Sequence, residues 1–218
     1  MPNKKLRLLV TAGPTREMLD PVRFLSNVST GYMGYQIAAQ AKRVGHEVIL
    51  ISGPTALTPP NGIRFVSVLS AKDMKQAVSR FWTKADALIM TAAVCDYTPV
   101  RFSSRKIKRI KQKTIRFKRT ADILKSIGKR KDSRVVVGFA LETEAIEQNA
   151  LRKLRGKNLD LIVANWFTPK NNPFGKSRIS VILIGQDGSK KLVRNLTKPA
   201  LSRVLLKEVG RLIASKKG

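Results

Sequence analysis

Residues 11–39, TAGPTREMLDPVRFLSNVSTGYMGYQIAA, concentrate the residue types that bind anions. An apolar run that predicts a strand over 6–10 comes before them, and they run into a predicted helix. Glycines let a backbone approach phosphate oxygens closely, and the start of a helix directs N–H groups at them. Arginine and asparagine side chains add donors for carboxylate or phosphate oxygens. These residues are Gly13, Arg16, Arg23, Asn27, Gly31 and Gly34.

This segment therefore predicts an anion-binding turn in an α/β nucleotide site. Its glycine spacing fits neither the loop of P-loop nucleotide triphosphatases nor the dinucleotide fingerprint. Neither of those two families is implied.

The elements that would position this turn alternate between strand and helix patterns. Several of the strand patterns are nearly continuous in valine, isoleucine and leucine, as in parallel strands buried on both faces. The alternation predicts right-handed βαβ units in one α/β domain over residues 1–218, with a Rossmann-like, doubly wound, mostly parallel sheet. Strands are predicted at 6–11, 47–52, 64–68, 87–90, 134–139 and 159–163, and helices at 32–44, 71–84 and 142–154.

Two regions depart from this alternation. Residues 100–119 form a basic stretch that cannot be a core helix, and its end alternates like an exposed strand. Residues 171–194 contain a strand pattern, a turn at Asp187 and Gly188, and a return strand, which predicts a β excursion from the sheet. Thr197 and Pro199 are typical of a helix start, and this last helix is expected to reach about Ser215.

Composition excludes several classes of protein. Hydrophobic residues make up 43% of the 218 residues, which argues against disorder. No apolar run is long enough to span a bilayer and no signal peptide is evident, so we expect a cytoplasmic protein without a membrane partner. The single cysteine, Cys95, excludes an intramolecular disulfide and has no base beside it. We expect Cys95 and the single histidine, His46, to be structural, and no cluster has the spacing of a metal site.

The formal net charge of +29 raises an alternative. A charge of this size is typical of nucleic-acid-binding proteins, so a non-catalytic nucleic-acid-binding protein on a Rossmann-like scaffold is the alternative hypothesis. No helix-turn-helix, zinc finger or aromatic–basic RNA motif supports it, and scattered surface lysines explain the charge more simply. A dinucleotide-dependent reductase is less favoured still, because the GxGxxG pattern is absent.

Four ordered motifs resemble one known family. DPVRFLSN with STGYMGY (20–35), AAVCDY (92–97), KIKR (106–109), and GFALET with KLRGKNLDLIVAN (138–143 and 153–165) are similar to the signature of phosphopantothenoylcysteine synthetase. That enzyme is the phosphopantothenate–cysteine ligase of coenzyme A biosynthesis. The resemblance spans nearly the whole chain and implies a stand-alone, bacterial-type ligase domain without the flavin-dependent decarboxylase domain. Flavin is therefore not expected, and the resemblance implies a homodimer built through the β excursion at about 171–194.

The resemblance also implies a reaction. CTP, preferred over ATP and accompanied by Mg²⁺, would activate phosphopantothenate as an acyl-cytidylate, and cysteine would then form the amide. Asn27, near the reacting carboxylate, and Lys106, on a basic lid over 100–119, are the implied catalytic residues. The implied substrate-binding residues are Arg23, Asn27, Ala92, Ala93 and Asp96. The implied nucleotide-binding residues are Gly13, Ser29, Gly31, Gly34, Asp96, Lys106, Ala121, Asp122, Ile123, Leu124, Phe139, Lys153, Lys157 and Asn165.

Two details of this set bear on phosphate binding. Lys153 and Lys157 lie four residues apart, so they would share one helix face and could clamp one polyphosphate. Tyr32 stands where members of the resembled family commonly have lysine or arginine. One phosphate-facing charge is therefore either lost or supplied from elsewhere.

Overall fold

A central sheet of eight strands organises the computed structural model, which describes residues 5–109, 114–168 and 171–216. The strands are β1 (Arg7–Ala12), β4 (Glu47–Ser52), β5 (Arg64–Ser67), β6 (Ala87–Met90), β9 (Val135–Glu142), β10 (Leu161–Trp166), β11 (Ile179–Gly185) and β12 (Lys190–Leu196). Their spatial order is β12-β11-β10-β9-β6-β1-β4-β5. The strands from β5 to β10 pair in parallel, while β11 and β12 are antiparallel additions at the edge.

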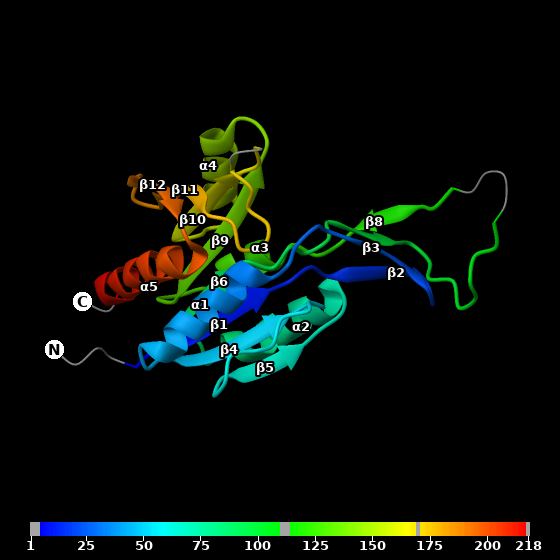
Figure 1. Cartoon of the computed structure of the whole chain (residues 1–218), viewed down its shortest axis with the longest axis horizontal. Coiled ribbons are helices and arrows are strands. Elements are labelled where there is room, and N and C mark those ends of the chain that lie inside the picture. The colour runs from blue at the N-terminus through cyan, green and yellow to red at the C-terminus, as the bar shows by residue number, and fades with distance from the viewer. Residues whose placement is uncertain (1–4, 110–113, 169–170, 217–218) are drawn as a thin grey trace.

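Helices cover both faces of this sheet (Figure 1). The helices are α1 (Tyr32–Arg43), α2 (Ala71–Trp82), α3 (Ile123–Gly128), α4 (Ile146–Gly156) and α5 (Lys198–Ser215). Side chains of α1 and α5 share one hydrophobic cluster, and those of α2, α3 and α4 share the other. The predicted Rossmann-like, doubly wound fold is confirmed.

Alternation within the apolar runs places the two clusters on opposite faces of the sheet. In β1, Leu8 and Val10 belong to the cluster of α1 and α5, whereas Leu9 between them belongs to the cluster of α2. All three side chains are buried. A central parallel strand therefore needs apolar residues at successive positions, which explains its continuous hydrophobic sequence.

The region predicted as a β excursion forms an antiparallel hairpin that follows the parallel part of the sheet. β11 pairs with β10, and β12 pairs with β11, both antiparallel. The turn at Asp187 and Gly188 is present, with Gly188 at φ 82°. The strand, the turn and the return strand predicted within 171–194 are therefore all present, as two antiparallel strands at the edge of the sheet.

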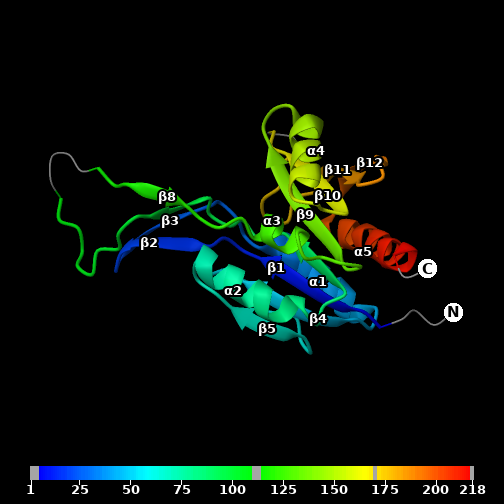
Figure 2. The same cartoon turned by 180° about the vertical axis from the view of Figure 1, so that it is seen from behind.

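A separate arm leaves the body at the carboxyl ends of the parallel strands. It consists of β2 (Arg16–Asp20) paired with β3 (Arg23–Ser26), and β7 (Tyr97–Pro99) paired with β8 (Phe117–Arg119). Figures 1 and 2 show the arm extending away from the central sheet. The sequence predicted only its last strand, within the basic stretch 100–119, of which residues 110–113 lie outside the described residues.

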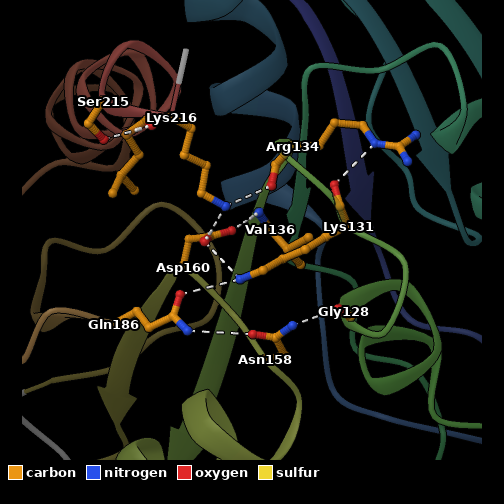
Figure 3. A network of polar contacts seen from close by, with 10 residues as sticks. Gly128, Lys131, Arg134, Val136, Asn158, Asp160, Gln186, Ser215 and Lys216 are labelled. Carbon is orange, nitrogen blue, oxygen red and sulfur yellow. Dashed lines mark hydrogen bonds and ion pairs between the residues drawn. The ribbon is translucent and has the colours of Figure 1, made fainter. Parts of the chain in front are cut away.

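A buried ion network joins Lys216, the residue after α5, to the amino ends of β9 and β10 (Figure 3). Asp160, with a side chain 2% exposed, accepts from Lys131 Nζ at 2.8 Å and from Lys216 Nζ at 2.7 Å. Its second oxygen accepts from the backbone N–H of Val136 at 2.8 Å. A buried carboxylate is tolerated when its charge and lone pairs are satisfied in this way. The network ties the amino ends of β9 and β10 to the C-terminal end of α5.

None of the helices within the described ranges combines the length and apolar character needed to cross a bilayer.

Candidate functional site

The strand order creates a crevice beside β1. The chain passes from β1 through α1 to β4 on one side, and later returns through α2 to β6 on the other side. Ligands of open α/β sheets bind at such a switch point, outside the carboxyl ends of the strands. Here the loops after β1 and β6 are joined, because Thr91 Oγ1 donates to the Thr11 carbonyl at 2.6 Å and the Ala93 N–H donates to the Gly13 carbonyl at 2.9 Å.

Two glycines allow α1 to start close to these loops. A Cβ at Gly34 would lie 2.6 Å from both Ala12 Cβ and Thr91 Oγ1, so only glycine lets the helix approach the strand ends. Gly31 caps α1 at φ 75°, in the left-handed region that favours glycine. No side chain caps this helix, and its first turn contains no acidic residue. The start of α1 is therefore an electropositive backbone surface suited to an anion.

A cavity of about 480 Å³ opens in front of this helix start. Its walls come from the loop before α1, the carboxyl ends of β6, β9 and β10, the segment before β11, and the first residue of α5. It brings together ten of the predicted site residues. These are Asn27, Ser29, Gly31, Gly34, Ala92, Ala93, Asp96, Phe139, Lys153 and Asn165.

A second cavity of about 460 Å³ adjoins the first. The two share Ala92, Val94, Asp96 and Phe139 as lining residues. The predicted nucleotide-binding residues that line the second cavity are Asp96, Ala121, Asp122, Ile123, Leu124, Phe139 and Lys157. Two connected spaces of this kind suit two ligands that must meet at one point.

Lys153 and Lys157 do not form the expected common clamp in this structure. Lys153 Nζ pairs with Glu142 Oε1 at 2.5 Å, and Lys157 Nζ pairs with Asp122 Oδ2 at 3.0 Å. Lys157 is the residue after α4, so it departs from the helix face that carries Lys153. Each lysine lines a different cavity and has its own carboxylate. A bound polyphosphate would have to compete with these carboxylates for the two ammonium groups.

Asn27 connects its loop to the end of β6. Its Nδ2 donates to the carbonyls of Ala93 at 3.2 Å and Val94 at 3.1 Å. The donor group expected beside the acyl carbon is therefore engaged by the backbone. The carbonyl oxygen of the side chain is the group left to meet a ligand in the cavity.

Three predicted site residues lie outside both cavities: Gly13, Arg23 and Lys106. Gly13 lies beneath the site, where its carbonyl accepts from Ala93. Arg23 donates through Nε to Asp20 Oδ2 at 3.0 Å and through Nη2 to the Ile107 carbonyl at 2.6 Å. Lys106 is exposed on the arm beside that contact.

Asp20 anchors the basic stretch at Ile107. Its side chain is fully buried, and its Oδ2 also accepts from the Ile107 N–H at 3.0 Å. The hydrogen bonds from Arg23, with further ones from backbone N–H groups, hold the pKa of Asp20 well below its usual range. In this structure Arg23 therefore serves the attachment of the arm, and it does not face the cavities.

Cys95 and His46 have structural surroundings. Cys95 is buried, its N–H donates to Thr15 Oγ1 at 3.0 Å, and burial raises the pKa of its thiol. His46 lies at the opposite edge of the sheet, where its Nδ1 accepts from the Leu6 N–H at 3.5 Å. Neither arrangement provides an activated nucleophile.

Sequence reasoning missed Lys198 in the larger cavity wall and Asn171, which holds a segment that contributes to that wall. Lys198, the first residue of α5, lines the cavity and is 1% exposed, but its neighbours Thr197 and Pro199 had indicated only a helix start. Asn171 holds the segment before β11, since its Nδ2 donates to the Trp166 carbonyl at 2.8 Å and its Oδ1 accepts from the Ser180 N–H at 2.7 Å. No sequence pattern marked Asn171 as more than a loop residue.

Metal-ligand side chains are not clustered in the parts of the chain that the structure describes. There, no group of three or more histidine, cysteine, aspartate or glutamate side chains is placed to hold a metal ion.

Comparison with known proteins gives a consistent family. Residues 3–212 match the family described as "DNA/pantothenate metabolism flavoprotein C-terminal domain". The chain is 45% identical over 209 residues to the coenzyme A biosynthesis bifunctional protein CoaBC of Bacillus subtilis, covering 94% of this chain and 51% of that protein. The protein of the same name from Escherichia coli K12 is 40% identical over 211 residues, covering 94% and 52%. The chain thus spans about half the length of these curated relatives.

Solved structures agree with this result. A crystal structure of the C-terminal domain of the coenzyme A biosynthesis bifunctional protein CoaBC has a TM-score of 0.84 and 42% identity, covering 98% of this chain and 97% of that one. A Cab2 mutant in complex with phosphopantothenate-cysteine has a TM-score of 0.80 at 15% identity, covering 99% and 90%. The second likeness, at its low identity, shows the shared fold alone.

The crowding around Gly31 gives a testable prediction. Gly31→Ala puts an alanine into a left-handed backbone conformation, which costs about 1–2 kcal/mol. It also brings the new Cβ to 2.8 Å from Thr55 Cγ2. Gly45→Ala, at φ 90° after the other end of α1, carries the same backbone cost with nothing within 4 Å of the new Cβ. In urea titrations we expect Gly31→Ala to lower the free energy of unfolding by about 1–3 kcal/mol more than Gly45→Ala does. Equal losses would show that the close approach at Gly31 is unimportant for packing.

Proposed function

The chain belongs to the DNA/pantothenate metabolism flavoprotein C-terminal domain family, and from this premise we propose that it joins phosphopantothenate to cysteine with CTP. The single observation that carries the proposal is the pair of adjoining cavities at the switch point. One contains Asn27 and the uncapped start of α1, the other contains Asp122 and Lys157, and the implied nucleotide-binding residues are divided between the two. The relatives named above, described as coenzyme A biosynthesis proteins, support this proposal over nucleic-acid binding.

The reaction we propose has two steps. A carboxylate oxygen of phosphopantothenate attacks the α-phosphorus of CTP, and the bond to the β-phosphate breaks with release of pyrophosphate. The cysteine amine then attacks the acyl carbon, loses a proton, and displaces cytidine monophosphate to leave an amide. Both steps need alignment and charge neutralisation more than a protein nucleophile, and Cys95 and His46 offer none.

The residues around the shared wall have complementary roles in this proposal. The start of α1 and Lys153 would receive phosphate oxygens, and Phe139, between the two cavities, would contact the nucleoside. Asn27 would keep its loop on the Ala93 and Val94 carbonyls and present Oδ1 to the acyl group. Mg²⁺ usually keeps substrate phosphates and few protein carboxylates as ligands. Asp96 lines both cavities and forms no ion pair with any described residue, so it fits such an ion held mainly by the nucleotide.

Pyrophosphate release tests the proposed function. We expect release from CTP that depends on phosphopantothenate, with turnover only when cysteine is also present. Phe139, Lys153 and Lys157 resemble the pattern of bacterial members of the family, which use CTP, so we expect a specificity constant for CTP well above that for ATP. Equal constants would remove the base preference, and no release with either nucleotide would refute the ligase.

Lys106 requires a separate proposal, because it lines neither cavity. We propose that the arm brings Lys106 to the phosphates during the first step, either within one chain or from a second copy. A contact made only in the transition state raises turnover without tightening substrate binding. The Asp20–Ile107 attachment would then fix the base from which Lys106 reaches.

Lys106→Ala is therefore expected to lower kcat about 100-fold while the Kd for phosphopantothenate stays within about twofold. Lys108→Ala is the matched control, since it removes the same charge from the other side of Ile107. We expect Lys108→Ala to change kcat much less. If Lys106→Ala keeps full activity, or if both variants lose the same activity, residues 100–119 are an ordinary solvent-exposed run of charges without a catalytic role.

The arm is also the surface that we propose for a homodimer, in place of the segment 171–194. The arm carries a group of large, solvent-exposed apolar side chains, which is typical of a protein–protein interface. They include Val22, Phe24, Leu25, Tyr97, Val100, Phe102, Ile115 and Phe117.

Light scattering can distinguish the two surfaces. We expect Phe102→Asp, at a side chain 58% exposed on the arm, to convert a dimer into a monomer. Leu192→Asp, at a side chain 47% exposed on β12, is the control and should leave the dimer intact. The reverse pattern would restore the interface at β11 and β12, and a monomeric parent chain would contradict the dimer altogether.

A further inference from the structure

Lys198 is a charged side chain inside the larger cavity wall that the function described so far does not use. It is the first residue of α5 and only 1% exposed. The same cavity is lined by Gly31, Tyr32 and Gly34 at the start of α1. Burying an ammonium is unfavourable unless it gains compensating contacts, so its presence here calls for a physical explanation.

The protein contacts of Lys198 are neutral. Its Nζ donates to the carbonyl oxygens of Gly175 at 2.5 Å and Ser177 at 3.4 Å. It also lies 6.0 Å from the centre of the Tyr32 ring, at the outer limit of a cation–π contact. No carboxylate among the described residues forms an ion pair with it. The other deeply buried lysine, Lys131, has Asp160 as a direct counter-ion at 2.8 Å.

The start of α1 adds positive potential near Lys198, and Asp96, the carboxylate that lines the same cavity, forms no ion pair with Lys198. The N-terminus of α1 has no side-chain cap and no acidic residue in its first turn. Lys153 in the same cavity is already paired with Glu142. An ammonium has three donors, and carbonyl oxygens occupy two of those of Lys198. One donor and the whole charge are therefore available to a ligand.

We infer that Lys198 is a further substrate-binding residue, whose ammonium contacts a phosphate group seated at the start of α1. This inference rests on the proposed function and names the charge that receives one phosphate of its substrates. It also answers the question raised by Tyr32, where the resembled family commonly has a basic residue. Here the ring of Tyr32 lies beside Lys198, and Lys198 supplies the charge that Tyr32 cannot.

The protonation of Lys198 makes this role measurable. Burial lowers the pKa of Lys198 to about 8, so the ammonium predominates at pH 7 and is lost as the pH rises through 8. Phosphate affinity should fall over the same interval. A bound phosphate favours the ammonium form and raises the pKa of Lys198, so binding near pH 8 should take up a proton. The second ionisation of a phosphate monoester lies near pH 6, so the ligand's own charge changes little between pH 7 and 9.

Titration calorimetry of the whole chain with CTP and with phosphopantothenate, in separate arms, tests the inference and identifies which phosphate is bound. We expect Lys198→Met to weaken one of the two ligands at least tenfold at pH 7. The parent should lose affinity for that ligand between pH 7 and 9, and Lys198→Met should not. Lys198→Arg keeps a charge that does not titrate in this range, so this variant should bind the ligand with an affinity that stays the same between pH 7 and 9.

Thr197→Ala is the structural control. Thr197 Oγ1 accepts from the Ala200 N–H at 3.4 Å, so this variant weakens the start of α5 and leaves the charge of Lys198 in place. We expect Thr197→Ala to show the same loss of affinity between pH 7 and 9 as the parent. If Lys198→Met does not fold, proton uptake by the parent at pH 8, measured in buffers of different ionisation enthalpy, decides the question.

The outcomes separate the two levels of the proposal. Three results would each overturn the role of Lys198. The first is an affinity of Lys198→Met within twofold of the parent for both ligands. The second is a loss of affinity between pH 7 and 9 that persists in Lys198→Met, and the third is a parent chain that takes up no proton on binding. The ligase proposal would remain standing in those cases. A parent that binds neither ligand and releases no pyrophosphate would overturn both.

Discussion

Close backbone contact at the carboxyl end of β1 is the constraint on which the site depends. The loop after β1, the start of α1 and the loop after β4 meet where Gly31 and Gly34 stand, and a Cβ at either position would lie under 3 Å from its neighbours. This approach lets the first turn of α1 reach the cavity without a side chain in the way. It also brings the loops after β1 and β6 near enough to hydrogen-bond, which fixes the crevice at the switch point.

Charge around the cavities is more balanced than the composition suggests. The chain carries a formal net charge of +29, but Glu142 and Asp122 neutralise the two lysines that would clamp phosphates. Anion binding there would exchange one set of ion pairs for another, which yields a modest net gain. The uncapped start of α1 and Lys198 face no such competition. Selective attraction of a phosphate therefore depends on a few unpaired positive groups, and the abundant surface cations contribute mainly a long-range field.

Features that depend on neighbouring residues in the sequence could be predicted, whereas features that depend on distant contacts could not. The buried parallel strands were found because their apolar runs report burial directly. Motifs singled out Asn27, Phe139 and Lys153, and all three line the larger cavity. The arm strands β2 and β3 were missed, because their motif was interpreted chemically and their apolar residues stay exposed. Arg23 was expected at the substrate, yet its guanidinium turns to Asp20, a contact fixed by the shape of a hairpin. Lys198 carried no signal at all, since its burial comes from α5 packing beside α1.

The arm is connected directly to the site, both along the chain and by hydrogen bonds. The hairpin of β2 and β3 leaves the body just after Gly13 and returns at Asn27, so both of its ends lie at the crevice. Asp20, near its turn, holds Ile107 and thereby the stretch that carries Lys106. At the other end, Asn27 is pinned to the carbonyls of Ala93 and Val94. The position of the arm and that of the loop before α1 are therefore linked through these hydrogen bonds, and the same links constrain where Lys106 lies. Coupling of this kind needs no separate hinge, because β3 runs directly from Arg23, the ion-pair partner of Asp20, to the residue before Asn27.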